Sequence, residues 1–241
     1  MEKRINSAAD LSSWAEKSDL LKDLLHTIQG VAAQINLLGW CEANAGNISV
    51  NVTRELSSVV TGNADWYLVS RTGSRYRQLA QDPIPSLVLV SVSGSFETFS
   101  PSQAAPTSEW SCHRKLQEHF KNRDLKERVI LHSHPASIIQ LSQMEIYKEE
   151  ILLNQALAKA LPEYSLYLPE GAACVSFAPP GSKELAEATY RAIKDRKILF
   201  WQGHGIISCG ENPDQALDRM EVAEKAARIL LHKFLLTKYR L

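Results

Sequence analysis

Apolar residues recur along the chain in two rhythms, and these rhythms define the predicted secondary structure. In residues 18–40 the apolar side chains return every three to four positions, which is the period of an amphipathic helix, and Ser18 is a suitable N-cap. The same period predicts helices at residues 107–120, 145–161, 182–195 and 212–236. Asn212 is the expected cap of the last helix, with Pro213 in its first position.

Shorter apolar runs lie between these helices and are rich in β-branched and aromatic residues. They predict strands at residues 46–52, 66–70, 87–93, 127–134, 171–177 and 197–210. Glycine and proline mark the connecting turns, and neither a linker nor a repeat interrupts the pattern. We therefore expect one α/β domain over residues 1–241, in which helices cover a mixed or antiparallel sheet.

Composition narrows the function classes. The 241 residues are 44% hydrophobic and 22% charged, as in ordinary globular proteins, and 27 basic residues balance 27 acidic ones. This balance gives no reason to expect a nucleic acid or an anionic membrane as a partner. The start of the chain has no apolar segment of signal-peptide length, so a cytoplasmic protein is expected. The four cysteines have no CxxC spacing, which argues against a zinc ribbon or a disulfide framework.

Two histidines stand at the end of one predicted strand, in the segment VILHSHP. Side chains alternate between the faces of a strand, so His132 and His134 are expected on one face with Ser133 on the other. Two imidazoles on one face can share a metal ion. They can equally be two ordinary histidines at a solvated strand end.

A third histidine, His204, lies between two glycines in the segment QGHGIIS. Gly-His-Gly can simply form a tight turn, but the four histidines outside these segments fall within predicted helices and call for no function. Three histidines on one zinc ion leave a fourth position open for water or substrate, which is the catalytic arrangement. Cupins also use an HxH pair, but they are all-β barrels with a glutamate soon after it. The long predicted helices exclude that fold.

Three short polar segments stand at predicted turns and helix starts. Hydroxyls, amides and glycine N–H groups in such places can close on the oxygens of a phosphate monoester. Each segment alone could equally be a turn or a helix cap, and Glu109 alone could be an ordinary acid beside a helix N-terminus. The segments contain Asn44, Gly46 and Asn47, then Thr72, Gly73 and Ser74, then Thr107, Ser108 and Glu109.

The motifs GNIS, TGS, PTSEW, HSH and GHG occur in this order, and with them the chain resembles the class II aldolase/adducin family from about Leu20 to Leu235. The resemblance implies one zinc ion on His132, His134 and His204. It also implies that Glu109 is an acid/base, and that Glu163 assists proton transfer in a neighbouring subunit of a homotetramer with its sites at subunit interfaces. The phosphate site implied consists of Asn44, Gly46, Asn47, Thr72, Gly73, Ser74, Thr107 and Ser108.

The chemistry that this resemblance implies is cleavage of a ketose 1-phosphate, L-rhamnulose 1-phosphate or a similar sugar. The products would be dihydroxyacetone phosphate and an aldehyde such as L-lactaldehyde, with the metal stabilising the enediolate. A pentulose-phosphate 4-epimerase or a methylthioribulose-phosphate dehydratase would share the metal and phosphate groups, and Glu109 in PTSE favours the aldolase. A non-catalytic binding module of the adducin type remains a further alternative, against which the intact set of three histidines argues.

Overall fold

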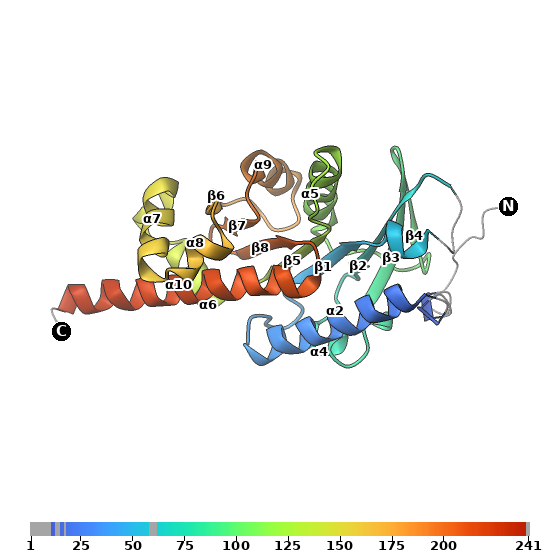
Figure 1. The fold of residues 1–241 in the computed structure, drawn as a ribbon, viewed down its shortest axis with the longest axis horizontal. Coiled ribbons are helices and arrows are strands. Elements are labelled where there is room, and N and C mark those ends of the chain that lie inside the picture. The colour runs from blue at the N-terminus through green and yellow to red at the C-terminus, as the bar shows by residue number, and fades with distance from the viewer. Residues whose placement is uncertain (1–10, 13–14, 17, 58–61, 240–241) are drawn as a thin grey trace. The chain divides into compact units, whose positions relative to one another are not determined.

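The chain forms two compact units, Met1–Trp110 and Ser111–Leu241, in a computed structural model that describes residues 11–12, 15–16, 18–57 and 62–239 (Figure 1). Each unit contains four of the described strands. Within these described ranges, no helix combines the length and the apolar character that crossing a bilayer requires.

The main helix of unit 1 is α2 (Asp19–Leu37). Its predicted N-cap is present: the Ser18 hydroxyl accepts a hydrogen bond from the Leu21 N–H at 3.3 Å. Gly39, with φ of +69°, follows the helix in the left-handed conformation that commonly ends one. The apolar face is buried as the period predicts, through Leu21, Leu24, Leu25, Ile28, Val31, Ala32 and Ile35. The shorter helices of the unit are α3 (Thr53–Leu56), α4 (Tyr76–Leu79) and the 3-10 helix η1 (Ile84–Ser86).

The strands of unit 1 form an antiparallel meander in the order β4-β3-β2-β1. They are β1 (Asn47–Asn51), β2 (Asp65–Ser70), β3 (Leu87–Ser93) and β4 (Phe96–Ser100). Alternate residues of β2 and β3 lie on one face of the sheet and pack in a core that also contains Trp110. Strand β4 was not predicted, because it is an edge strand in which exposed and half-exposed residues alternate up to the buried Ser100, with Phe96 79% exposed.

The strands of unit 2 form a mixed sheet in the order β5-β8-β7-β6. They are β5 (Val129–Ser133), β6 (Ala172–Val175), β7 (Ile198–Trp201) and β8 (Gly205–Gly210). Strand β8 is antiparallel to both β5 and β7, whereas β6 and β7 run parallel. The apolar run predicted at residues 197–210 is therefore a hairpin of two strands, and His204 lies in its turn.

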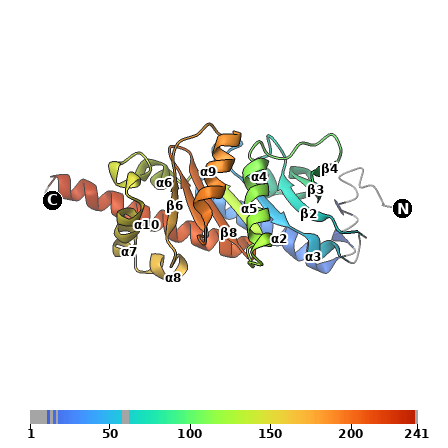
Figure 2. The ribbon, with the colours of Figure 1, turned by 90° about the horizontal axis from the view of Figure 1, so that it is seen from above.

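Helices cover both faces of this second sheet. Helices α5 and α9 lie over one face, and the long helix α10 follows the other face together with α6 (Figures 1 and 2). Residues of α5, α9 and all four strands share one buried cluster, which includes Phe120, Ile130, Leu199, Trp201 and Ile207. The helices are α5 (Trp110–Asn122), α6 (Ala136–Leu141), α7 (Glu150–Ala160), α8 (Glu163–Tyr167), α9 (Lys183–Ile193) and α10 (Pro213–Tyr239), with the 3-10 helix η2 (Glu145–Lys148).

The predicted fold class, α/β with mixed and antiparallel strands covered by helices, is confirmed. Two helix predictions were inaccurate at their boundaries. Helix α5 begins at Trp110 rather than at the predicted Thr107 or Ser108 cap, and the helix predicted at residues 145–161 is divided into η2 and α7. The division places the buried Tyr147 hydroxyl beside the Val175 and Phe200 carbonyls. That the two units make up a single domain stays a prediction.

Candidate functional site

His132 is fixed by the sheet of unit 2. It lies on β5 opposite Ile207 of β8 and is fully buried, on the sheet face that also carries Ile130. Its Nδ1 is 2.8 Å from the carbonyl oxygen of Ile206. A carbonyl only accepts, so Nδ1 carries the proton and the lone pair lies on Nε2.

His134 follows β5 directly. Pro135 comes next, has no N–H for a strand ladder and favours an extended conformation of the residue before it. Helix α6 begins immediately afterwards, and its first turn is held by α10: the Ile138 N–H donates to the Glu224 carboxylate at 3.2 Å. The backbone around His134 is thus held by strand β5 on one side and by a capped helix on the other.

The turn between β7 and β8 carries His204. Its N–H donates to the Trp201 carbonyl at 3.0 Å, and Gly203 occupies the left-handed region with φ of +67°. The Gly203 N–H donates to the Ser142 hydroxyl, which comes from the end of α6. The same short helix therefore anchors the segments that carry His134 and His204.

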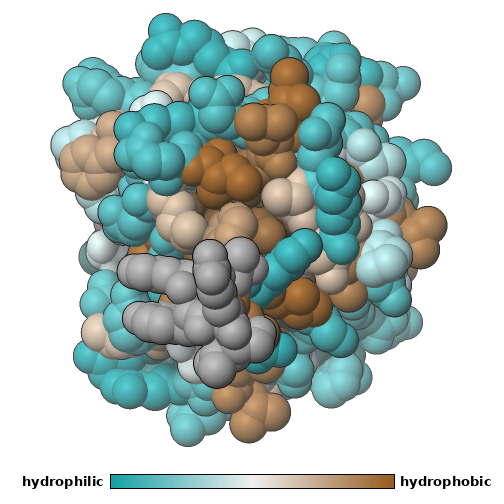
Figure 3. Space-filling model, turned by 90° about the vertical axis from the view of Figure 1, so that its left-hand side faces the viewer, coloured by the Kyte–Doolittle hydropathy of each residue, from teal (hydrophilic) through white to brown (hydrophobic). Residues whose placement is uncertain are grey.

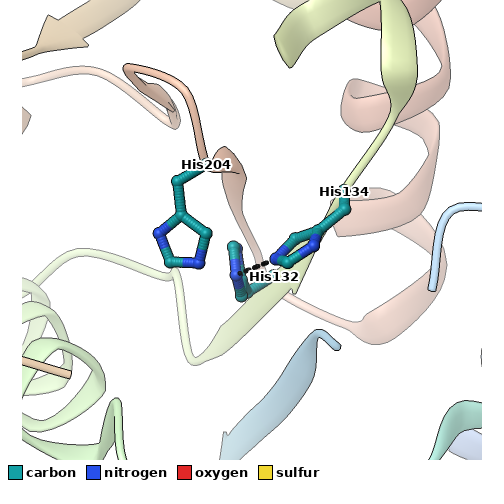
Figure 4. A group of neighbouring side chains, drawn as sticks. All are labelled: His132, His134 and His204. Carbon is teal, nitrogen blue, oxygen red and sulfur yellow. Dashed lines mark hydrogen bonds between the residues drawn. The ribbon is translucent and has the colours of Figure 1, made fainter. Parts of the chain in front are cut away.

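The three imidazoles converge on one point (Figure 4). Each can offer a ring nitrogen, and these nitrogens all lie within 4.8 Å of one another. The two Nε2 atoms of His132 and His134 are 3.2 Å apart. Ligands at zinc–nitrogen distances of about 2.0–2.1 Å in a tetrahedron lie roughly 3.3–3.4 Å apart, so this donor set fits a divalent ion.

The protonation of His132 also suits a metal ligand. Burial, and then the neighbouring His134, lowers the pKa of His132 to about 3. The ring is neutral at neutral pH, which is the form in which imidazole binds a metal.

Two residues beside the histidines were missed by the sequence analysis. Gly205 is at the start of β8, and a Cβ there would lie 2.4 Å from the Ser133 carbonyl oxygen and 2.9 Å from His134 Cδ2. Trp201 places its ring 4.8 Å from that of His132 and 5.1 Å from that of His204. The second glycine of GHG was a usable signal for a close approach, whereas Trp201 looked like an ordinary core residue.

A second polar cluster lies in unit 1, around Glu109. The Glu109 side chain is 4% exposed, and its Oε2 accepts a hydrogen bond from Asn47 Nδ2 at 2.8 Å. The Asn47 carbonyl in turn accepts from the Tyr76 hydroxyl at 2.8 Å. Burial raises the pKa of Tyr76 well above its usual value, so this hydroxyl stays protonated as a donor. Glu109 is thus buried and held by a hydrogen bond, whereas an ordinary acid at a helix start is exposed to solvent.

The polar turn Thr72–Gly73–Ser74 lies beside the segment that leads to Glu109. The Thr72 N–H donates to the Ala105 carbonyl and the Thr107 N–H to the Ser70 carbonyl. The second and third predicted phosphate-binding segments are therefore adjacent within unit 1, and the bond from Asn47 to Glu109 joins the first segment to the third. Because the N–H groups of Thr72 and Thr107 donate within the chain, these two residues would contact a phosphate through their hydroxyls. In Ser74 both the N–H and the hydroxyl donate to the Arg71 carbonyl.

The remaining predicted site residues are exposed, except Gly46, which is half-buried. Asn44 lies in the turn before β1, and Ser108 lies just before α5. Gly46 precedes β1 with φ of +76°. Glu163 is the first residue of α8 in unit 2, and its side chain faces solvent. Its predicted role depends on a neighbouring subunit and stays a prediction.

The chain belongs to the family described as the class II aldolase and adducin N-terminal domain, whose model matches residues 27–231. This match confirms the family expected from the motifs. Families of this class depend on a metal ion, in agreement with the cluster of three histidines.

Individual relatives define the enzyme class. The chain is 24% identical to the rhamnulose-1-phosphate aldolase of Bacteroides thetaiotaomicron, over 92% of this chain and 90% of that protein. It is 28% identical to the rhamnulose-1-phosphate aldolase of Listeria welshimeri, over 80% and 77%. The solved structure of a sugar-phosphate aldolase from Thermotoga maritima matches 90% of this chain and 97% of its own, with 30% identity and a TM-score of 0.79. These matches confirm the predicted enzyme class, a class II aldolase and therefore a lyase.

The first testable prediction concerns Gly205. In Gly205→Ala, the new methyl group must displace either the Ser133 backbone or the His134 ring. We expect the affinity for a divalent metal ion to fall roughly 10–100-fold, as when support for a ligand is lost, and the free energy of unfolding to fall by about 1–3 kcal/mol. Chelator competition and urea denaturation of the metal-free protein measure the two effects.

The matched control is Gly30→Ala in α2, where a Cβ meets no atom within 4 Å. It should be neutral, or stabilise by up to ~1 kcal/mol through helix propensity. If Gly205→Ala behaves like Gly30→Ala in both measurements, the close approach at β8 does not constrain the histidines.

Proposed function

We propose that the chain is a zinc-dependent aldolase that cleaves L-rhamnulose 1-phosphate, or a closely similar ketose 1-phosphate, to dihydroxyacetone phosphate and an aldehyde such as L-lactaldehyde. The observation that carries this proposal is the cluster of His132, His134 and His204, whose nitrogens fit one divalent ion. The relatives named rhamnulose-1-phosphate aldolase support the choice of substrate.

His132, His134 and His204 would hold the zinc ion. Bound there, zinc supplies Lewis-acid stabilisation for the negative charge that develops on substrate oxygens when the C3–C4 bond breaks. The burial of His132 and its hydrogen bond to the Ile206 carbonyl support this role, because burial keeps the ring neutral and the hydrogen bond fixes its orientation.

Glu109 is the proposed acid/base at C3 of the dihydroxyacetone phosphate fragment. A proton-transfer group must be held in a defined orientation, and the Asn47 amide donates to one oxygen of this carboxylate at 2.8 Å. This hydrogen bond fixes the Oε2 oxygen and so orients the carboxylate. The Asn47 Nδ2 group has a second hydrogen, so its predicted contact with phosphate is compatible with the bond to Glu109.

The substrate phosphate is proposed to bind in unit 1. The exposed Thr72 and Ser108 offer hydroxyls, and Gly73 and Gly46, with φ of +76° each, let the backbone approach an anion closely. Ser74 belongs to the proposed set as well, and its hydroxyl would exchange its present bond to the Arg71 carbonyl, at 2.8 Å, for one to the phosphate. Asn44 and Thr107 complete the proposed set. Binding the phosphate, which does not react, positions the sugar and lowers the entropic cost of reaching the transition state.

Glu163 is proposed to act on the C4 hydroxyl within a homotetramer, in the site of a neighbouring subunit. Its helix α8 lies with α7 and the end of α10 on a face where apolar side chains reach the surface among hydrophilic ones (Figure 3). Exposed Ile151, Leu152, Leu166, Leu235 and Leu236 contribute to these helices, with exposed fractions of 50–77%. Apolar residues at such exposure favour contact with another chain.

A metal and product assay tests the proposed function. The purified protein should contain about one zinc ion per chain and release dihydroxyacetone phosphate from L-rhamnulose 1-phosphate. His134→Ala should lose both metal and activity, since only two of the three imidazoles remain. Epimerised or dehydrated products instead of dihydroxyacetone phosphate would assign the chain to another reaction, and full zinc occupancy in His134→Ala would refute the metal site.

Replacement of Glu109 tests the acid/base. In Glu109→Gln the side-chain oxygen can still accept from Asn47, so the fold and the zinc content should be unchanged. Turnover should fall by about 10²–10⁴-fold, the usual contribution of a general acid or base. The control is Glu118→Gln on α5, a half-exposed carboxylate paired with Arg114, which should keep full turnover. Equal turnover in the two variants would remove Glu109 from the mechanism.

Subunit complementation tests Glu163. Oligomers of Glu163→Ala alone and of His134→Ala alone should each be inactive or nearly so. When the two chains are mixed and reassembled, some sites should combine an intact metal centre with an intact Glu163, and activity should return. If reassembled oligomers that contain both chains are no more active than the parents, Glu163 does not serve a neighbouring site.

A further inference from the structure

Trp201 is in contact with two of the three proposed metal ligands. Its ring is stacked on that of His204, with an interplanar angle of 24° and ring centroids 5.1 Å apart. It also meets the His132 ring, at 46° and 4.8 Å. The side chain is 1% exposed, so the indole excludes water from this side of the cluster.

The orientation of Trp201 is fixed from its other edge. The indole Nε1–H donates to Thr189 Oγ1 at 3.0 Å, and Thr189 is a fully buried residue of α9. A buried indole N–H without a partner is costly, which favours the one rotamer that reaches this hydroxyl. The backbone is fixed as well, because Trp201 pairs with Gly205 on β8 and with Val175 on β6.

Core packing alone accounts for only part of these contacts. Trp201 belongs to the buried cluster between the sheet and helices α5 and α9, where any large apolar side chain would fill space. Its carbonyl, however, also accepts the His204 N–H, so one residue both closes the turn that carries His204 and covers the His204 ring. An indole face is also rich in π-electron density, which favours an imidazole that gains positive charge when it coordinates a cation.

We propose that Trp201 is a positioning residue of the metal centre: held by Thr189, its indole fixes the His204 and His132 rings in the orientation that binds the metal. The proposal rests on the proposed zinc site at His132, His134 and His204. Trp201 itself offers no ligand to the metal. It acts by restricting the two rings to their binding rotamers before the metal arrives, which lowers the entropic cost of binding.

The test compares zinc affinity in Trp201→Leu and Phe120→Leu, measured by chelator competition on the full chain. Phe120 is 1% exposed in the same buried cluster. Within the described part of the chain, its ring makes no aromatic contact with His132, His134 or His204. Both variants lose aromatic volume from this core, so both should lose thermal stability. Only Trp201→Leu should bind zinc more weakly, by roughly 10–100-fold, as is typical when the residues that support a metal ligand are replaced.

Cobalt substitution gives a readout that a purely structural role would not change. The visible absorption of Co²⁺ depends on the geometry of its ligands, so the band should change in Trp201→Leu and stay as in the wild type in Phe120→Leu. Trp201→Phe keeps a ring against His204 and should restore most of the affinity and the wild-type band. If Trp201→Leu does not fold, Thr189→Val tests the proposal instead. This variant removes only the hydrogen-bond acceptor of the indole N–H, and it should also weaken zinc binding.

The outcomes separate this proposal from the one on which it rests. A wild-type chain that binds no zinc overturns the metal centre and the role of Trp201 with it. The role of Trp201 alone is overturned if the wild-type chain binds zinc but the zinc affinities of Trp201→Leu and Phe120→Leu agree within about threefold and both variants show the same cobalt band. Where Thr189→Val is the deciding variant, an unchanged zinc affinity likewise overturns it.

Discussion

The hydrogen bond between His132 Nδ1 and the Ile206 carbonyl joins the architecture of unit 2 to its chemistry. Strands β5 and β8 must pair in the observed register for this carbonyl to reach the ring. A shift of one residue would turn His132 to the opposite face of the sheet, away from Trp201 and into the side covered by α10. The register in turn depends on Gly205, where any side chain would meet the neighbouring strand. A backbone feature thus decides which nitrogen of a buried imidazole is available for a metal.

Unit 1 uses a comparable arrangement for its carboxylate. Asn47 is the first residue of β1, and its side chain and carbonyl face two different partners, Glu109 and Tyr76. The carboxylate is therefore anchored to the end of a strand, although Glu109 itself precedes a helix. Both units support a reactive side chain from a backbone position near the start of a strand, Ile206 on β8 and Asn47 on β1, where the backbone is held by strand pairing.

The sequence predicted the elements with strong periodicity and the residue types with distinctive chemistry. Helix α2 and the strand before HSH follow directly from their apolar patterns, and all three histidines converge as expected. The apolar run around GHG was predicted as strand, but its division into the hairpin of β7 and β8 was not. Edge strand β4 was missed because half-exposed residues carry little hydrophobic signal. The contacts of Trp201 and Asn47 could not be predicted, because tertiary folding brings each residue to a distant partner. Trp201 contacts His132, which lies 69 positions earlier in the chain. Asn47 contacts Glu109, which lies 62 positions later.

The three histidines differ in how they are held, and this difference bears on the kinetics of metal exchange. His132 is immobilised inside a sheet, whereas His134 and His204 are part-exposed and lie on a strand end and a hairpin turn. The turn of His204 is secured to α6 by the bond from the Gly203 N–H to the Ser142 hydroxyl. A metal ion held here would exchange through the side of His134 and His204, at a rate set by the opening of that turn. Residence time and equilibrium affinity would then be governed by different parts of the molecule, the hairpin for the first and the buried sheet for the second.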